Sequence, residues 1–142
     1  MGYIRKLTRE KSSMGSIIVT SGKQKGEYLP LGQRTSVIGR DEALSLQVLD
    51  ALVSRKHLRI WFDKASNKYF ADDMQSKHGV FINKHKITNS TVLNEGDEIL
   101  IGNTILLYTD EDLDSRESAL AHYKKRGERA YRTRGDSYIS PP

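Results

Sequence analysis

The chain has 142 residues, with 23 Lys and Arg against 18 Asp and Glu, and no cysteine. This length fits one domain with a sizeable core and leaves little room for a second. The lack of cysteine excludes disulfides and thiolate metal sites. No apolar run is long enough to span a bilayer, and no secretory segment follows Met1. We therefore expect a soluble cytoplasmic protein without a membrane partner.

The pattern along the chain predicts three parts. Residues 1–13 are polar and basic without periodicity, which indicates a flexible basic N-terminal tail. Residues 14–110 contain short β-branched and aromatic runs separated by turn residues, which is typical of an all-β sandwich or barrel. The runs are residues 16–20, 27–31, 35–38, 57–63, 69–71, 80–82, 98–101 and 104–108.

Residues 111–142 form a C-terminal tail of different character. Asp112 or Asp114 can cap a helix, and acidic residues precede basic ones as the helix macrodipole favours. We expect the tail to be helical and then disordered. Its basic segment, residues 124–134, has six cations and one acid. Most simply, this segment is a solvated helix end.

Three short segments lie at the edges of strand-like runs and so on connections. They are Gly39-Arg40, Ser54-Arg55-Lys56-His57, and Ser76-Lys77-His78-Gly79 followed by Val80-Phe81-Ile82-Asn83. Arg presents a planar fork of donors to a dianion, a hydroxyl adds a short hydrogen bond, and Lys adds a mobile charge. Loops on a rigid sandwich commonly carry binding groups. The three segments therefore predict one anion-binding surface made of loops.

The same segments resemble the signature of the forkhead-associated (FHA) domain: Gly39-Arg40, then Ser54-x-x-His57, then a glycine turn leading into Val80-Phe81-Ile82-Asn83. Each segment alone is unspecific. The match to the family depends on the order of the three segments, their spacing and their placement between strands. The resemblance covers roughly residues 14 to 110. It implies an FHA-type β-sandwich of about eleven strands that binds phosphothreonine peptides through loops at one end.

The resemblance also implies roles for single residues. The family's counterparts of Arg40 and Ser54 contact the phosphate, and Lys77 stands where family members place a hydroxyl or a cation near it. Arg55 matches a position that often reaches the backbone or side chains of the phosphopeptide. The alternative is that Arg55 and Lys56 are ordinary exposed cations, and a solvated surface arginine is the corresponding alternative for Arg40.

His78 departs from the commonest family pattern, which has Asn before the glycine. A neutral imidazole donates once and accepts once, but it cannot reproduce the geometry of an amide. We therefore expect a changed peptide affinity or register. Gly39, His57 and Gly79 are expected to support the site, because the family's counterpart of His57 braces the Ser54 loop from inside.

Ser54 and His57 also invite comparison with a nucleophile and its base. A hydrolase would need a third orienting group and an oxyanion hole, and no glycine elbow surrounds Ser54. We therefore expect no enzyme activity. The histidines show no metal-ligand spacing, so we expect no metal and no cofactor. They stand at positions 57, 78, 85 and 122.

The partner that the resemblance implies is a phosphothreonine-containing protein, either a Ser/Thr kinase or its substrate. Two alternatives remain open. One is a scaffold that binds partners without phosphate, which phosphatase treatment of the partner would reveal. The other is a nucleic-acid binder that uses residues 124–134, with Tyr123 and Tyr131 stacking on bases. Deleting residues 111–142 would separate this alternative from phosphopeptide binding.

Thr8 is a candidate regulatory site. It lies in Arg5-Lys6-Leu7-Thr8-Arg9-Glu10, with basic residues upstream that many kinases favour. Some proteins that this chain resembles carry a phosphorylated threonine in such a tail, where it occupies its own domain. A short tether raises the effective concentration to the millimolar range. An unchanged affinity for external peptide after phosphorylation of Thr8 would exclude the role.

Overall fold

The computed structural model describes residues 15–113 and residue 121. Eleven strands lie between Ser16 and Thr109, so the all-β sandwich predicted from the sequence is confirmed. The domain boundaries at residues 14 and 110 stay predictions. Thr8, the basic segment 124–134 and most of the predicted C-terminal helix lie outside the described residues.

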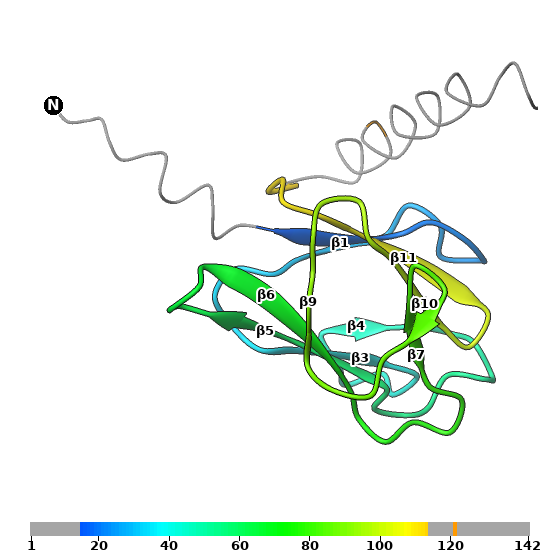
Figure 1. Ribbon diagram of the computed structural model, residues 1–142. Coiled ribbons are helices and arrows are strands. Elements are labelled where there is room, and N and C mark those ends of the chain that lie inside the picture. Colours follow the sequence, from blue (N-terminus) through cyan, green and yellow to red (C-terminus); the bar gives the residue numbers. More distant parts are fainter. Residues whose placement is uncertain (1–14, 114–120, 122–142) are drawn as a thin grey trace, which may run out of the picture.

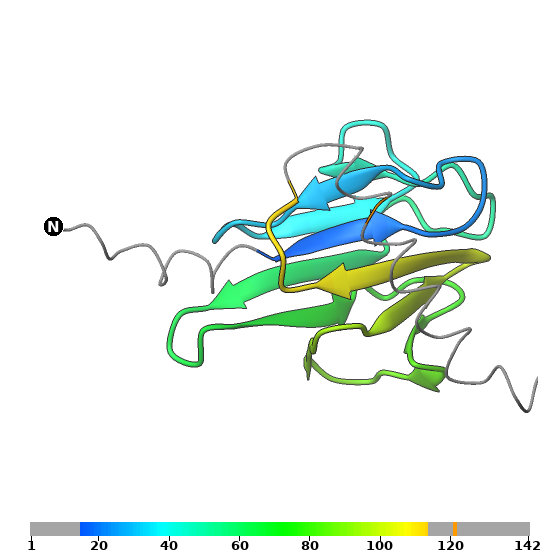
Figure 2. The ribbon, with the colours of Figure 1, turned by 90° about the horizontal axis from the view of Figure 1, so that it is seen from above.

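The strands form two sheets that face each other (Figures 1 and 2). The six-stranded sheet has the order β2 (Tyr28–Pro30), β1 (Ser16–Val19), β11 (Thr104–Thr109), β10 (Glu98–Ile101), β7 (Val80–Ile82) and β8 (His85–Lys86). The five-stranded sheet has the order β4 (Leu46–Gln47), β3 (Ser36–Gly39), β5 (Leu58–Asp63), β6 (Lys68–Asp73) and β9 (Thr91–Val92). Only β3 and β4 pair in parallel among these neighbours.

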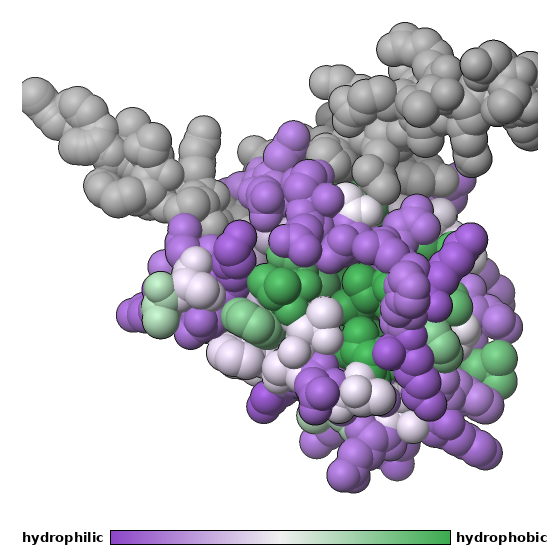
Figure 3. All heavy atoms as spheres, in the orientation of Figure 1, coloured by the Kyte–Doolittle hydropathy of each residue, from purple (hydrophilic) through white to green (hydrophobic). Residues whose placement is uncertain are grey.

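Alternation along the strands builds the core between the sheets. In β5, Leu58 and Ile60 are fully buried while Arg59 between them is exposed, because successive side chains of a strand point to opposite faces. Burying each such aliphatic side chain contributes roughly 1.5–3 kcal/mol. Figure 3 shows apolar residues between the sheets, framed by hydrophilic ones.

Three strands were not predicted from the sequence: β4, β8 and β9, each of two residues. Two residues are too few for a period to be visible. The β7–β8 hairpin turns at Asn83 and Lys84, whose φ angles are +50° and +74°, the positive-φ pair of a primed turn. The Asn83 amide holds this turn, since it donates to Asp97 Oδ1 at 2.9 Å and accepts from Glu98 N at 3.0 Å.

The two ends of the described range 15–113 lie close together. Leu113 N donates to Ser16 Oγ at 3.1 Å, and the Leu113 side chain is buried against Ile18 and Leu107. Both ends leave the sandwich at the opposite end from the three loops predicted to bind an anion (Figure 1). Within residues 15–113 and at residue 121, no helix is long and apolar enough to cross a membrane, and no cluster of His, Asp and Glu fits a metal ion.

Candidate functional site

Three loops at one end of the sandwich carry the residues singled out from the sequence (Figure 1). They are the β3–β4 loop (residues 40–45), the β4–β5 loop (residues 48–57) and the β6–β7 loop (residues 74–79). Hydrogen bonds tie the second loop to each of the other two. The loops therefore form one surface, as the sequence predicts.

Gly39 is required because two backbones meet there. A Cβ atom at this position would lie 2.3 Å from Arg55 O and 2.8 Å from Ser54 O, far inside van der Waals contact. The missing side chain lets the end of β3 approach the β4–β5 loop, and Arg40 N donates to Ser54 O at 3.1 Å. Gly39 thus sets the spacing between Arg40 and Ser54.

Arg40 is exposed at the start of the β3–β4 loop. Its Nε donates to Val53 O at 2.9 Å, so the protein itself engages one of the three guanidinium nitrogens. This bond orients the guanidinium along the β4–β5 loop. Among the described residues, no hydrogen bond engages its two terminal nitrogens, and this pair can bind an anion in bidentate fashion.

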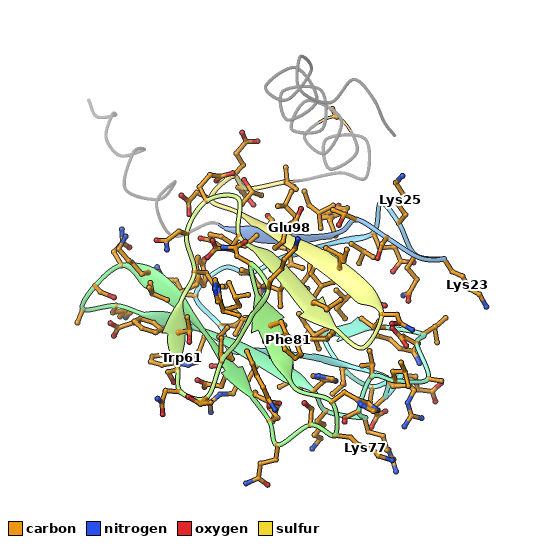
Figure 4. All side chains as sticks on the ribbon, turned by 45° about the vertical axis from the view of Figure 1, so that its right-hand side comes forward. Lys23, Lys25, Trp61, Lys77, Phe81 and Glu98 are labelled. Carbon is orange, nitrogen blue, oxygen red and sulfur yellow. The ribbon has the colours of Figure 1, made fainter. Side chains whose placement is uncertain are left out.

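Ser54 and Lys77 connect the second and third loops. Lys77 N donates to Ser54 Oγ at 3.0 Å, which commits an oxygen lone pair and leaves the hydroxyl hydrogen to be donated elsewhere. The Lys77 side chain is exposed and points away from the sandwich (Figure 4). A hydroxyl donor and the exposed Lys77 side chain therefore lie on two loops that adjoin each other, and the first of these loops also adjoins Arg40.

His57 is fully buried beneath these loops. Ser54 N donates to its Nδ1 at 3.0 Å, and its Nε2 lies 2.8 Å from Gly79 O. A carbonyl only accepts and an amide N–H only donates, so the imidazole is the neutral tautomer with its proton on Nε2. One ring thereby holds the β4–β5 and β6–β7 loops together from inside.

The β6–β7 loop closes with a hydrogen-bonded turn. Ser76 N donates to Asp73 Oδ1 at 3.0 Å, and Gly79 N donates to Ser76 Oγ at 2.9 Å. Gly79 has a φ of +87°, which a residue with a side chain adopts only under strain. His78 is exposed just before it, where its imidazole faces solvent and is open to a ligand.

Arg55 and Lys56 are both exposed on the β4–β5 loop. Among the described residues, the only salt bridge joins Arg59 to Asp72, on the β5–β6 pair. The positive charges of the three loops are therefore not paired with acids of the described chain. Their roles in binding stay predictions, since exposure alone fits a solvated cation equally well.

Asp50 was not singled out from the sequence, although it anchors the β4–β5 loop. Its Oδ1 accepts from Leu52 N at 2.9 Å, and its Oδ2 accepts from Asn103 N at 2.7 Å and Thr104 Oγ1 at 2.8 Å. Partial burial opposes ionisation, but these hydrogen bonds hold the pKa of the Asp50 carboxyl below its usual value. The loop is thus fixed to the turn between β10 and β11.

Gln24 anchors the β4–β5 loop at a second point. Its amide accepts from Leu49 N at 2.7 Å and donates to Gln47 O at 2.6 Å. No local motif signals either anchor, because Gln47 and Leu49 lie more than twenty residues from Gln24, and Asn103 and Thr104 lie more than fifty residues from Asp50. Anchored loops present their side chains in a prepared geometry, which lowers the entropic cost of binding.

The geometry does not support a hydrolase. Both ring nitrogens of His57 are engaged by backbone groups, one by Ser54 N and the other by Gly79 O. The Ser54 hydroxyl is hydrogen-bonded to Lys77 N instead. Within the described residues, Ser54 therefore has no imidazole positioned to remove its proton.

Comparison with known proteins gives the family. The FHA domain model matches residues 36–102. The chain is 33% identical over 92 residues to the oxoglutarate dehydrogenase inhibitor of Corynebacterium jeikeium, a match that covers 65% of this chain and 62% of that protein. The chain thus spans less than two thirds of the length of this relative.

Solved structures share the fold. The FHA domain of an Arabidopsis thaliana protein superposes with a TM-score of 0.67 at 25% identity, covering 74% of this chain and 92% of that chain. A structure from a study of phosphothreonine-dependent FHA domain interactions superposes with a TM-score of 0.60 at 23% identity, covering 68% and 95%. The matched residues 36–102 include all three loops of the site, and this part of the chain is an FHA domain.

Proposed function

We propose that this protein is a non-catalytic module that binds phosphothreonine peptides through the three loops. A phosphothreonine brings nearly two negative charges and three acceptor oxygens. In this proposal the terminal nitrogens of Arg40 hold two oxygens, the Ser54 hydroxyl donates to the phosphate, and Lys77 adds a charge. Arg55 and His78 contact the peptide, while Gly39, His57 and Gly79 support the loops.

One observation carries the proposal: hydrogen bonds link Arg40, Ser54 and Lys77 in sequence across three loops. Arg40 N bonds to Ser54 O at 3.1 Å, and Ser54 Oγ bonds to Lys77 N at 3.0 Å. These bonds hold the three residues on adjoining loops, which supports the proposal that a guanidinium, a hydroxyl and an ammonium act on one phosphate. Charge-assisted hydrogen bonds of this kind are roughly twice as strong as neutral ones.

The partner in this proposal is a phosphothreonine-containing protein, a Ser/Thr kinase or its substrate. A relative named as an inhibitor of an enzyme and a related structure studied for phosphothreonine-dependent interactions both support regulation through protein binding. The predicted cytoplasmic location stays a prediction, which cell fractionation would check.

The test is a calorimetric titration with one peptide in three forms, carrying phosphothreonine, phosphoserine or threonine at the same position. We expect binding of the phosphothreonine form and none of the threonine form. The phosphoserine form should bind about fourfold more weakly, because one methyl group is worth roughly 0.8 kcal/mol when buried. Equal binding of the threonine and phosphothreonine forms would replace this proposal with a phosphate-independent scaffold.

A further inference from the structure

Lys86 lies beside the loop that carries Lys77 and His78. On β8 it stands opposite Phe81 of β7. A Cβ atom built on Gly79 would meet Lys86 Cε at 3.0 Å, Lys86 Cδ at 3.7 Å and Phe81 Cε1 at 3.5 Å. The Lys86 side chain therefore runs across the backbone of Gly79, directly after His78. Figure 4 shows Phe81 on β7 and Lys77 on the loop below it.

This packing positions the ammonium group of Lys86. A lysine commonly lays its aliphatic stem on apolar surface while its charged head stays in water. The Nζ atom is one bond beyond Cε, so it lies near the point where the β6–β7 loop enters β7. Because the stem is already held by Gly79 and Phe81, binding an anion there costs less side-chain entropy than for a free lysine.

No acid within the described residues pairs with Lys86, since the one salt bridge there joins Arg59 and Asp72. Two acids near the loops accept backbone N–H groups instead, Asp41 from Ala43 and Asp73 from Ser76. The charge of Lys86 therefore adds to that of the neighbouring exposed cations. A local excess of positive charge attracts ligands that carry negative charge.

We propose that Lys86 binds a second negative group of the same ligand, on a residue that flanks the phosphothreonine. This inference rests on the proposed function, and it makes Lys86 a specificity-determining residue that selects acidic phosphothreonine peptides. The phosphothreonine itself is held by Arg40, Ser54 and Lys77. The second group is a side-chain carboxylate or a second phosphate, and both offer the oxygen acceptors that an ammonium group binds.

The test uses fluorescein-labelled phosphothreonine peptides with neutral flanks, and the same peptides with glutamate at each flanking position in turn. For the wild type we expect one position at which glutamate strengthens binding about two- to fivefold, as for an exposed charge pair. Lys86→Gln should abolish this gain and leave the dissociation constant of the neutral peptide unchanged. Phosphoserine at that position distinguishes the two sources, because only a site that prefers phosphate gains more from it than from glutamate.

Lys84→Gln is the matched control. It removes the same charge from the same hairpin, but at the turn beyond Ile82, away from Gly79. This variant should keep the preference for glutamate, and the preference should shrink as salt is added.

Three results would overturn the inference. One is a preference that survives in Lys86→Gln. Another is an equal loss for acidic and neutral phosphopeptides in that variant, because it would place Lys86 on the phosphothreonine itself. The third is that the wild type binds the neutral phosphopeptide, but glutamate strengthens this binding at none of the flanking positions. A wild type that binds no phosphothreonine peptide overturns the proposed function as well.

Discussion

Ser54 makes hydrogen bonds through three different atoms, one within its own loop and one to each of the other two loops. Its N–H donates to His57 Nδ1, its carbonyl accepts from Arg40 N, and its hydroxyl oxygen accepts from Lys77 N. The hydroxyl hydrogen is the one donor of Ser54 that remains for a ligand. His57 is the opposite case, because the protein itself engages both of its ring nitrogens. One residue thus faces the ligand and the other braces the site.

Substitutions at these two residues should therefore have different effects: one at Ser54 should lower peptide affinity, and one at His57 should lower the stability of the fold. Ser54→Ala should weaken phosphopeptide binding about fivefold, the value of one hydrogen bond of about 1 kcal/mol, with a small loss of stability. His57→Ala should lower the free energy of unfolding by roughly 2–4 kcal/mol, because it leaves a cavity and two unsatisfied backbone groups. Urea unfolding and peptide titration of both variants check this.

His85→Ala is the control for this comparison, since His85 is exposed on β8. It should leave the free energy of unfolding nearly unchanged. A His57→Ala variant as stable as the wild type but weaker in binding would show that His57 contacts the ligand.

At the scale of elements, the end of β3 and the β4–β5 loop touch at Gly39. Gly39→Ala places a Cβ atom 2.3 Å from Arg55 O, so the backbone must move. We expect a loss of about 1–3 kcal/mol in the free energy of unfolding, together with weaker peptide binding because Ser54 shifts. Unfolding and titration measure the two effects.

Gly22→Ala is the comparison for Gly39→Ala. A Cβ atom at Gly22 meets nothing within 4 Å, although its φ is +80°. It should therefore cost some stability through backbone strain, about 1 kcal/mol, and leave binding unchanged. If both variants bind peptide like the wild type, the close approach at Gly39 does not position the site.

The stability that Asp50 contributes by anchoring the β4–β5 loop should depend on pH. The pKa of Asp50 is lower in the folded protein than its ordinary value of 3.8, so its contribution to stability is present above about pH 4 and is lost as the pH falls. Asp50→Asn should lower the free energy of unfolding at pH 7 by about 1–2 kcal/mol. The difference from the wild type should shrink below about pH 4.

Urea unfolding at a series of pH values measures this difference. Glu42→Gln, which neutralises an exposed acid of the neighbouring loop, should follow the wild type throughout. A difference between Asp50→Asn and the wild type that stays constant down to the acid limit would mean that ionisation of Asp50 does not stabilise the fold.

Sequence periodicity predicted the longer strands, because alternation as in β5 reports directly which face is buried. It could not predict β4, β8 and β9, whose two residues carry no period. In the site, the order of the motifs predicted that the loops of Arg40, Ser54 and Lys77 lie on one surface. The bond from Arg40 Nε to Val53 O, the anchor at Asp50 and the place of Lys86 over Gly79 depend on tertiary contacts that no local pattern encodes.

At the scale of the whole molecule, the sandwich separates the binding loops from its chain ends (Figure 1). The seven residues from Thr8 to Gly15 span at most roughly 25 Å when extended, and a six-residue strand such as β6 is roughly 20 Å long. A phosphorylated Thr8 would therefore reach the loops of its own domain only with the tail nearly extended. Its regulatory role stays a prediction.

The central claim is that the three loops bind phosphothreonine through Arg40. An oriented phosphothreonine peptide library probed with the wild type and Arg40→Ala in parallel tests it most directly. The wild type should retain a defined subset of peptides. Arg40→Ala should retain almost none, because it loses a charge-assisted contact worth roughly 1.5–3 kcal/mol. Retention of the same peptides by both proteins, or of none by either, would contradict the claim.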